Sequence, residues 1–263
     1  MKKKSAFIIF MMLCVILTSC VTTGFKDFYE PWYDDGYFPE NAYLAENETP
    51  EIIQTSNLNA KCREIASNWY WCIGYSGFNG ADLETDEINE ALQNLCKEKK
   101  AKLAIWAKEY TDTRSGVYSV PHTNYHSYTN SFGYTSSYTT TSYSTRSYSV
   151  QRYDFLSYLF VSIPTEYKVM YIPGFSVADL TQHDRDTYKQ NTGCLVNIVY
   201  KDTAAYYANL SHGDIITKIN GKPIFSVDDF IEFRKNASIG DIWNMVIIKN
   251  GQEKQVSFTF SLY

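Results

Sequence analysis

Two Asn-Gly pairs in the C-terminal third limit what this chain can fold into more than any other feature. Asn220-Gly221 and Asn250-Gly251 each lie between two strand-like runs of residues. Asn-Gly is the strongest short-range signal for a two-residue hairpin, because both residues tolerate the positive φ that a type I′ turn needs. The sequence therefore predicts antiparallel strands joined by two tight turns.

The segments around these turns have equally specific local signals. A strand is expected over 193–199, a short amphipathic helix over 201–210, and strand core at Ile215, Ile216 and Ile219. Gly213 supplies a turn that needs positive φ, and Asp214 bonds neighbouring N–H groups at the start of the next strand. A second helix over 228–235 and strands over 243–248 and 253–262 complete the predicted set.

In this order, the elements resemble a PDZ domain of the permuted, bacterial type found in HtrA proteases. The residues that carry the resemblance are the Ala-bearing helix, the run from Gly213 to Gly221, Gly240-Asp241 and the final Asn-Gly hairpin. The resemblance implies a domain over 170–263, a β-sandwich or barrel with two helices. It also implies that a peptide C-terminus or loop adds as a strand beside the second helix.

The resemblance implies a peptide-binding site formed by Gly174, Phe175, Ser176, Val177, Phe230, Ile231 and Arg234. Residues 174–176 would offer backbone N–H groups to a carboxylate, and 176–179 would form the edge strand that pairs with the peptide. The helix residues would line the opposite wall, although at least one of Phe230 and Ile231 is expected to face the core. Arg234 replaces a commonly aliphatic residue, so it either reaches a ligand carboxylate or is solvated.

The first twenty residues are predicted to be an export signal. Three lysines precede a run of about a dozen apolar residues, too short for a comfortable bilayer span. The run ends in Leu17-Thr18-Ser19-Cys20, which resembles a bacterial lipobox and implies that Cys20 carries lipid. Val21 rather than Asp at the next position favours the outer membrane by the same resemblance. An ordinary signal peptide and a short anchor helix remain as alternatives.

Residues 50–165 are predicted to form a small α+β domain, after a tether over 21–49 whose aromatic residues partly pack back on the body. Strands are expected at 51–54, 68–75, 103–107 and 152–163, in strand-helix-strand-strand order. The helix is expected over 86–100, because Ile88, Leu92, Leu95 and Cys96 recur at three- and four-residue intervals, with Thr85 as its N-cap. This region resembles a domain of secreted bacterial proteins, with no implied activity.

A low-complexity insertion lies between the last two of these strands. Ser, Thr and Tyr occupy 24 of the 35 positions in 115–149, and Arg146 is the only charged side chain there. The period-two alternation near its end favours a long two-stranded arm with a mobile tip. A disordered, solvated insertion is the alternative, because the segment has no aliphatic core.

Cysteine and histidine positions indicate neither a metal site nor another cofactor. Cys62 and Cys72 could form a disulfide in an oxidising compartment, or all four cysteines outside 1–20 could be small buried apolar residues. His122 and His126 are four residues apart in a segment where no helix is expected, and no third ligand is near in sequence.

Charge and motifs exclude several functions. Removal of residues 1–20 leaves 21 basic against 29 acidic residues, a net charge of −8, which excludes a compact nucleic-acid surface. The nucleophile motifs of HtrA proteases and of α/β-hydrolases are absent from the sequence, and no catalytic residue is predicted.

The sequence predicts a non-catalytic envelope protein, lipid-anchored and facing the periplasm or the cell surface. It would bind peptide C-termini or strands of other proteins as an adaptor or scaffold. An adhesive or structural role of the Tyr-rich arm is the alternative, and an unrecognised hydrolase in 50–165 is a third hypothesis.

Overall fold

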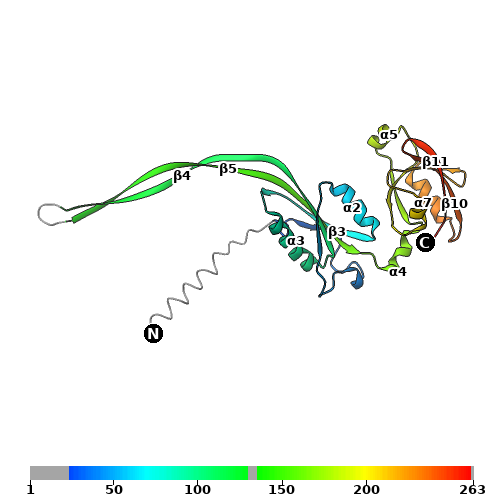
Figure 1. Ribbon diagram of the computed structural model, residues 1–263, viewed down its shortest axis with the longest axis horizontal. Helices are drawn as coiled ribbons and strands as arrows, with labels where there is room; N and C mark the ends of the chain where they lie inside the picture. The colour runs from blue at the N-terminus through cyan, green and yellow to red at the C-terminus, as the bar shows by residue number, and fades with distance from the viewer. Residues whose placement is uncertain (1–23, 130–134, 262–263) are drawn as a thin grey trace.

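A computed structural model of the chain describes residues 24–129 and 135–261, which form two sheets and the helices packed on them (Figure 1). The first sheet has five strands in the order β1-β3-β5-β4-β2, and the second has the order β11-β10-β8-β7-β6, with β9 beside β8. The fold is therefore of mixed α+β type, as predicted.

The first sheet belongs to the N-terminal domain. Its elements are β1 (Tyr29–Pro31), η1 (Glu40–Ala42), β2 (Glu51–Gln54), α2 (Leu58–Ser67), β3 (Tyr70–Ala81), α3 (Thr85–Lys99), β4 (Leu103–Thr129) and β5 (Thr135–Ser162). The β2–β4 pair is parallel, and the other pairs are antiparallel. The predicted face of α3 is buried, but Glu84 rather than Thr85 is its N-cap, and the Glu84 N–H donates to the Glu87 carboxylate at 3.1 Å.

The segment expected to be a tether is part of this domain from residue 24 onward. Phe25 is fully buried in the main core, and its ring packs edge-on against Phe78 at 4.9 Å. β1 extends the sheet by pairing with β3. Aromatic residues of this segment therefore pack on the body, as expected, and its strand β1 joins the sheet. Cys20 lies outside the described residues.

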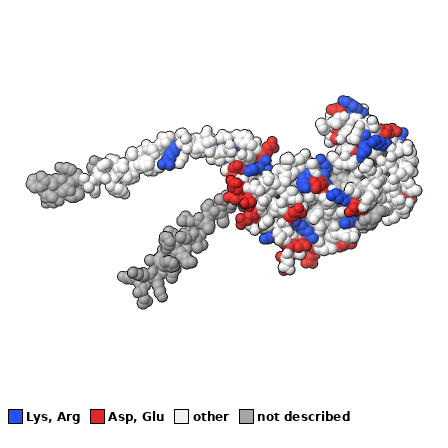
Figure 2. Space-filling model, in the orientation of Figure 1, with Lys and Arg blue, Asp and Glu red and all other residues white. Residues whose placement is uncertain are grey.

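The low-complexity insertion is a two-stranded ribbon, referred to below as the arm: residues 113–129 of β4 and 135–151 of β5. Their antiparallel ladder runs without a break from Thr113↔Gln151 to Thr129↔Thr135. The arm projects from the domain (Figure 1), and its surface is almost free of charge (Figure 2). The predicted mobile tip falls on residues 130–134, outside the described part of the chain.

The second sheet builds the C-terminal domain. After α4 (Thr165–Lys168) and η2 (Val169–Tyr171), its elements are β6 (Phe175–Asp179), α5 (Gln182–Tyr188), β7 (Cys194–Val199), α6 (Ala204–Tyr207), β8 (Ile215–Ile219), β9 (Lys222–Pro223), α7 (Val227–Lys235), β10 (Ile242–Lys249) and β11 (Gln252–Thr259). Asn220, Asn250 and Gly213 have φ of 48°, 53° and 92°, which confirms the predicted turns. Trp243 and Ile216 are fully buried at the centre of the core.

A small aromatic cluster joins the two domains. Trp69 stacks on Tyr200 at 4.5 Å between ring centroids, and its indole N–H donates to the Lys201 carbonyl at 3.0 Å. The Lys201 N–H in turn donates to the Ser67 carbonyl at 2.9 Å. Ile163, at the end of the last N-terminal strand, is buried in the same cluster. The domains therefore share a packed contact rather than only a linker.

The four cysteines in the described part of the chain occur as free thiols. Cys62 and Cys72 pack in one apolar cluster with Ile65 and Phe160, while Cys96 and Cys194 are buried in the two main cores. The structure therefore has two buried and two half-buried thiols, and it does not have the Cys62–Cys72 disulfide. Burial raises the pKa of Cys62 to about 11 and that of Cys72 to about 12.

Candidate functional site

An edge strand and a helix define a groove in the C-terminal domain. β6 is the last strand of its sheet and pairs only with β7 among the described strands. Helix α7 lies beside it: the Val227 N–H donates to Asp179 Oδ1 at 3.1 Å, at the far end of β6. At the near end, Arg234 Nη2 donates to the Met170 carbonyl at 3.0 Å. The groove therefore runs along β6 and α7, with a contact across each end.

Helix α7 begins where the sequence predicts, and its local chemistry explains why. Ser226 caps it: the Ser226 hydroxyl accepts from the Asp229 N–H, and the Asp229 carboxylate accepts from the Ser226 N–H at 3.1 Å. This reciprocal pair satisfies two N–H groups that a helix start leaves without partners. Arg234 and Lys235 fall in the last turn, where positive charge is favoured by the helix dipole.

The loop that opens β6 depends on Gly174. Its φ is +90°, and a Cβ added there would lie 2.5 Å from Thr203 Cβ. The Gly174 carbonyl accepts from the Tyr200 N–H at 2.9 Å and from the Thr203 hydroxyl at 3.3 Å. Only glycine fits this backbone, so the loop geometry is fixed by one residue.

The three N–H groups expected to form a carboxylate nest are not equivalent. The Gly174 N–H donates to the Tyr171 carbonyl at 2.6 Å. Because Tyr200 donates to Gly174, Phe175 and Val199 form a non-hydrogen-bonded pair, in which the Phe175 N–H points away from β7 and toward the groove. The Ser176 N–H accordingly points toward β7. One backbone donor, rather than three, faces a ligand.

The predicted side chains divide between core and groove. Phe175 and Phe230 are 5% and 3% exposed, and their rings pack at 5.5 Å in the core. Val177 is half-buried against the same core, whereas Ile231 is 39% exposed. Phe175 and Phe230 therefore support the groove from beneath. Ile231 is the predicted apolar residue that remains available to a ligand.

An apolar cavity of about 340 Å³ lies at the near end of the groove, lined by Ile172, Ile231, Arg234, Lys235, Ile239 and Phe260. Sequence reasoning missed Ile172, Ile239 and Phe260, which come from the loop before β6, the turn after α7 and the C-terminal segment. Ile239 is 71% exposed, which is unusual for a large apolar side chain and marks it as available to a ligand. This exposure could not be read from the sequence. The cavity suits an apolar side chain beside a carboxylate that Arg234 can reach.

Ser176 is a polar residue within strand β6 itself. Its hydroxyl is buried and has no hydrogen-bond partner among the described residues. A buried hydroxyl without a partner costs stability, so it is a candidate contact for a bound main chain.

The N-terminal domain reaches the loop from behind. The Trp71 indole N–H donates to the Tyr171 hydroxyl, and the Trp69 ring packs edge-on against Tyr171 at 6.0 Å. Ile172 packs against the same cluster while lining the cavity on its other side. The groove is therefore buttressed by both domains.

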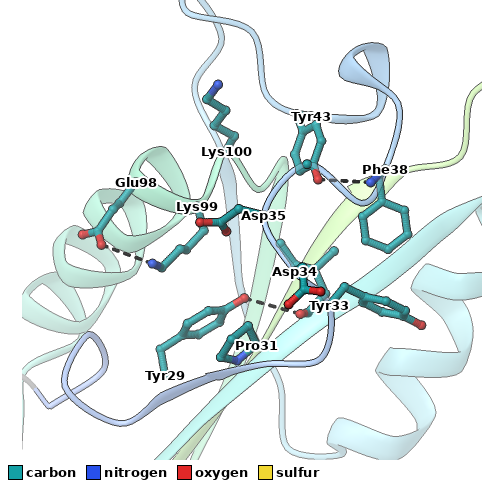
Figure 3. A pocket seen from close by; sticks show the side chains of 12 residues that line it. Tyr29, Pro31, Tyr33, Asp34, Asp35, Phe38, Tyr43, Glu98, Lys99 and Lys100 are labelled. Carbon is teal, nitrogen blue, oxygen red and sulfur yellow. Dashed lines mark hydrogen bonds and ion pairs between the residues drawn. The ribbon is translucent and has the colours of Figure 1, made fainter.

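A second cavity, of about 410 Å³, lies in the N-terminal domain between the 29–43 segment and the end of α3 (Figure 3). Lys99 pairs with Glu98 at 3.3 Å, and the Tyr29 hydroxyl donates to the Ile73 carbonyl at 3.5 Å. Burial raises the pKa of Tyr29 well above its ordinary range, so it stays protonated. Tyr43 also has a partner at this cavity, because its hydroxyl accepts from the Phe38 N–H at 3.3 Å.

The histidines and acidic groups do not gather around a metal. His122 pairs with Ser144 at 2.6 Å and His126 with Thr140 at 2.9 Å, each across the arm. Within the described ranges, no cluster of three or more His, Cys, Asp or Glu side chains could hold an ion. In the same ranges, no helix is long and apolar enough to cross a membrane.

Comparison with known proteins identifies the C-terminal domain. Residues 174–259 match the family described as PDZ domain, so the chain is a PDZ-containing protein. Similar solved structures include an HtrA-type protease, AlgW, with a decapeptide: 22% identity, 40% of this chain and 37% of that chain, TM-score 0.32. The HtrA3 PDZ domain bound to a phage-derived ligand (FGRWV) has 19% identity over 34% of this chain and 84% of that one, TM-score 0.30. This chain thus spans well under half of the AlgW chain, and no curated protein matches it.

Proposed function

We propose that this protein is a non-catalytic adaptor of the cell envelope whose PDZ groove binds the C-terminus of another protein as an added strand. The observation that carries the proposal is the open edge of β6 beside α7, ending at an apolar cavity next to Arg234. An added strand would gain main-chain hydrogen bonds along β6, and its last side chain would enter the cavity. The loop that contains Gly174 lies before β6, the first strand of the domain, and this order supports the permuted arrangement.

Arg234 would bind the ligand carboxylate, a role that the resemblance to PDZ domains gave to three backbone N–H groups. Pro173 has no N–H and the Gly174 N–H is engaged within the loop, so Phe175 supplies the remaining backbone donor. A guanidinium forms strong, charge-assisted bonds to carboxylate. Binding would exchange the Met170 carbonyl for the ligand carboxylate as partner of Arg234.

The test is a screen of C-terminal peptides with the full chain, followed by titration of the best binder with a free and with an amidated C-terminus. Arg234→Leu should weaken binding of the free acid by about 10- to 100-fold, since a hydrogen bond to a charged group contributes about 1.5–3 kcal/mol. It should leave the amidated peptide nearly unchanged. Equal affinity of both peptides for the parent chain would contradict carboxylate recognition.

Ile231→Asp tests the cavity separately. It should abolish binding of peptides with an apolar last residue, because the new carboxylate faces both an apolar side chain and the ligand's charge. Tyr207→Asp is the matched control: Tyr207 is 71% exposed on α6 and lines no part of the cavity. If the control weakens binding as much as Ile231→Asp, the groove is not the binding site.

We also propose that Cys20 carries the lipid that anchors the chain, in the outer membrane facing the periplasm or the cell surface. The lipobox and Val21 support this proposal. Cys20→Ser should move the protein from the membrane fraction to the soluble fraction, and should abolish metabolic labelling with fatty acid. Retention in membranes without Cys20 would indicate another anchor.

A further inference from the structure

The arm is a ribbon of two strands without a third. In the body of the sheet, β3 covers the outer edge of β5, but their pairing ends at Ala81↔Arg152. Among the described residues, no strand pairs with the outer edge of β5 over 135–151. At about 3.3 Å per residue this edge is roughly 55 Å long. An isolated two-stranded ribbon is marginally stable in water, and an unprotected edge is a template for another strand.

The two edges of the arm differ, because Pro121 lies in β4 opposite Tyr143. Proline is tolerated in a strand where its missing N–H would face outward. Both residues of such a pair direct their N–H and C=O outward, so Tyr143 presents these groups at the outer edge of β5. The outer edge of β4 lacks a donor at Pro121, whereas 135–151 contains no proline and no glycine. The β5 edge is therefore the one suited to pairing.

The charge of this edge permits pairing with a copy of itself. Over 135–151, Arg146 is the only charged side chain. Protective charges on an edge strand normally prevent self-association, and here they are almost absent. Antiparallel self-pairing centred on Tyr143 places Arg146 opposite Thr140 of the second copy, so the two arginines do not meet.

The spacing of tyrosines fits the same register. Tyr138 and Tyr148 lie five residues on either side of Tyr143. An antiparallel pair centred on Tyr143 therefore sets Tyr143 opposite its own copy and position 138 opposite Tyr148. Aromatic pairs directly across a ladder stabilise it. Tyr143 and Tyr148 are 70% and 48% exposed in the single chain, so both gain burial.

We propose that two copies of this chain pair through the outer edges of β5, antiparallel and centred on Tyr143, to form a four-stranded intermolecular sheet. The contact is isologous, with a two-fold axis at Tyr143. The free edge spans 135–151, where β3 does not cover β5, and centring on Tyr143 sets position 135 of one copy opposite position 151 of the other.

Disulfide trapping in cells that express the full chain tests the register. In Tyr143→Cys the new thiols would face each other in a hydrogen-bonded pair with Cα atoms about 5.5 Å apart, which suits a disulfide. In the control Thr139→Cys, each thiol would lie about 26 Å from its copy. A reducible dimer is expected with Tyr143→Cys and not with Thr139→Cys or the parent chain. No dimer with Tyr143→Cys, or equal dimer with Thr139→Cys, would overturn the proposal.

A charge variant tests the same register without altering the backbone. In the Tyr143→Cys background, Thr140→Arg places a second guanidinium opposite Arg146 of the partner, twice per dimer. Like charges directly across a ladder are unfavourable, so trapping should fall at least about fivefold. Adding Arg146→Glu should restore it. Failure of Thr140→Arg to reduce trapping, or of Arg146→Glu to rescue it, would reject the register.

A proline pair identifies the edge. Ser115 and Ser149 face each other across the arm, in the same hydrogen-bonding phase as Pro121 and Tyr143. Proline at either position removes an outward N–H and leaves the β4–β5 ladder intact. Ser149→Pro should reduce trapping in the Tyr143→Cys background, and Ser115→Pro should not. The reverse result would assign pairing to β4 and refute the proposal.

Discussion

Trp69→Ala tests whether the two domains form one thermodynamic unit. Trp69 is 8% exposed, stacks on Tyr200, and contacts Tyr171 edge-on. Its indole N–H donates to the Lys201 carbonyl, and Lys168 Nζ lies 4.8 Å above its ring. Removal of this one side chain therefore deletes both the stacked ring and the indole hydrogen bond that link the N-terminal domain to Tyr200 and Lys201.

The expected cost follows from these contacts. Truncation of a buried Trp to Ala typically costs about 3–5 kcal/mol, which includes the cavity left behind. We expect the free energy of unfolding to fall by about 4 kcal/mol. Trp69 also has a φ of 68°, a left-handed conformation that costs a non-glycine residue about 1–2 kcal/mol. Trp69→Gly should therefore be about 1 kcal/mol less destabilised than Trp69→Ala.

Urea unfolding of the full chain, followed by circular dichroism, measures the loss. Hydrogen exchange of residues 167–175 should show where it acts, since this segment packs on the Trp69 ring. Trp32→Ala is the control, because Trp32 is 51% exposed and should change stability by less than about 0.5 kcal/mol. If Trp69→Ala costs no more than Trp32→Ala, and exchange at 167–175 is unchanged, the domains are not coupled through this cluster.

Three further results are expected from local contacts. Asp214→Ala should lower the free energy of unfolding by about 3–5 kcal/mol in urea titration, because the partly buried Lys249 ammonium loses its partner. In the parent chain the two groups are 3.1 Å apart. A loss below about 1 kcal/mol would contradict this prediction. Gly174→Ala should cost about 3 kcal/mol by the same assay, from overlap with Thr203 and positive φ together, and a neutral effect would show that the loop adapts. Iodoacetamide should alkylate Cys62 about 100-fold more slowly at pH 8 than an exposed thiol with the ordinary pKa of 9.0, because only the thiolate reacts. The rate should rise about tenfold per pH unit toward the Cys62 pKa of about 11. Fast, pH-independent labelling would refute the raised pKa.

The PDZ fold was predictable because its signals are local. Asn220, Asn250 and Gly213 each require positive φ at a defined turn, and apolar runs of strand length lie between them. α2 was missed although Leu58, Cys62 and Ile65 follow helical spacing behind an Asn57 cap. The side chains of α2 are mostly half-exposed, so its apolar face is narrow and its pattern weak.

The site was less predictable than the fold because its parts meet only through tertiary packing. Ile172, Ile239 and Phe260 are far apart in sequence and line one cavity. Phe230 and Ile231 are neighbours, yet one is buried and the other exposed, since adjacent helical residues point about 100° apart. Sequence pattern identifies the helix, but only the packed structure decides which residue faces the groove.

Contacts from the N-terminal domain should affect ligand affinity as well as stability. A loop held in its binding conformation before the ligand arrives loses less entropy on binding, so affinity depends on what holds it. Trp71 holds it through the Tyr171 hydroxyl, whereas the Trp106 indole donates to Asn89 at 3.1 Å in a distant core. Trp71→Phe should therefore weaken the best C-terminal peptide by about 3- to 10-fold, the effect of losing one hydrogen bond of about 1 kcal/mol.

Trp106→Phe provides the contrast, because it removes an equivalent indole donor that does not reach the loop. It should lower stability by a similar amount and leave peptide affinity unchanged. Titration of one labelled peptide into both variants measures the difference under identical conditions. Equal affinity losses would mean that the effect is general destabilisation. No loss in either variant would mean that β6 and α7 form the groove without support from the N-terminal domain.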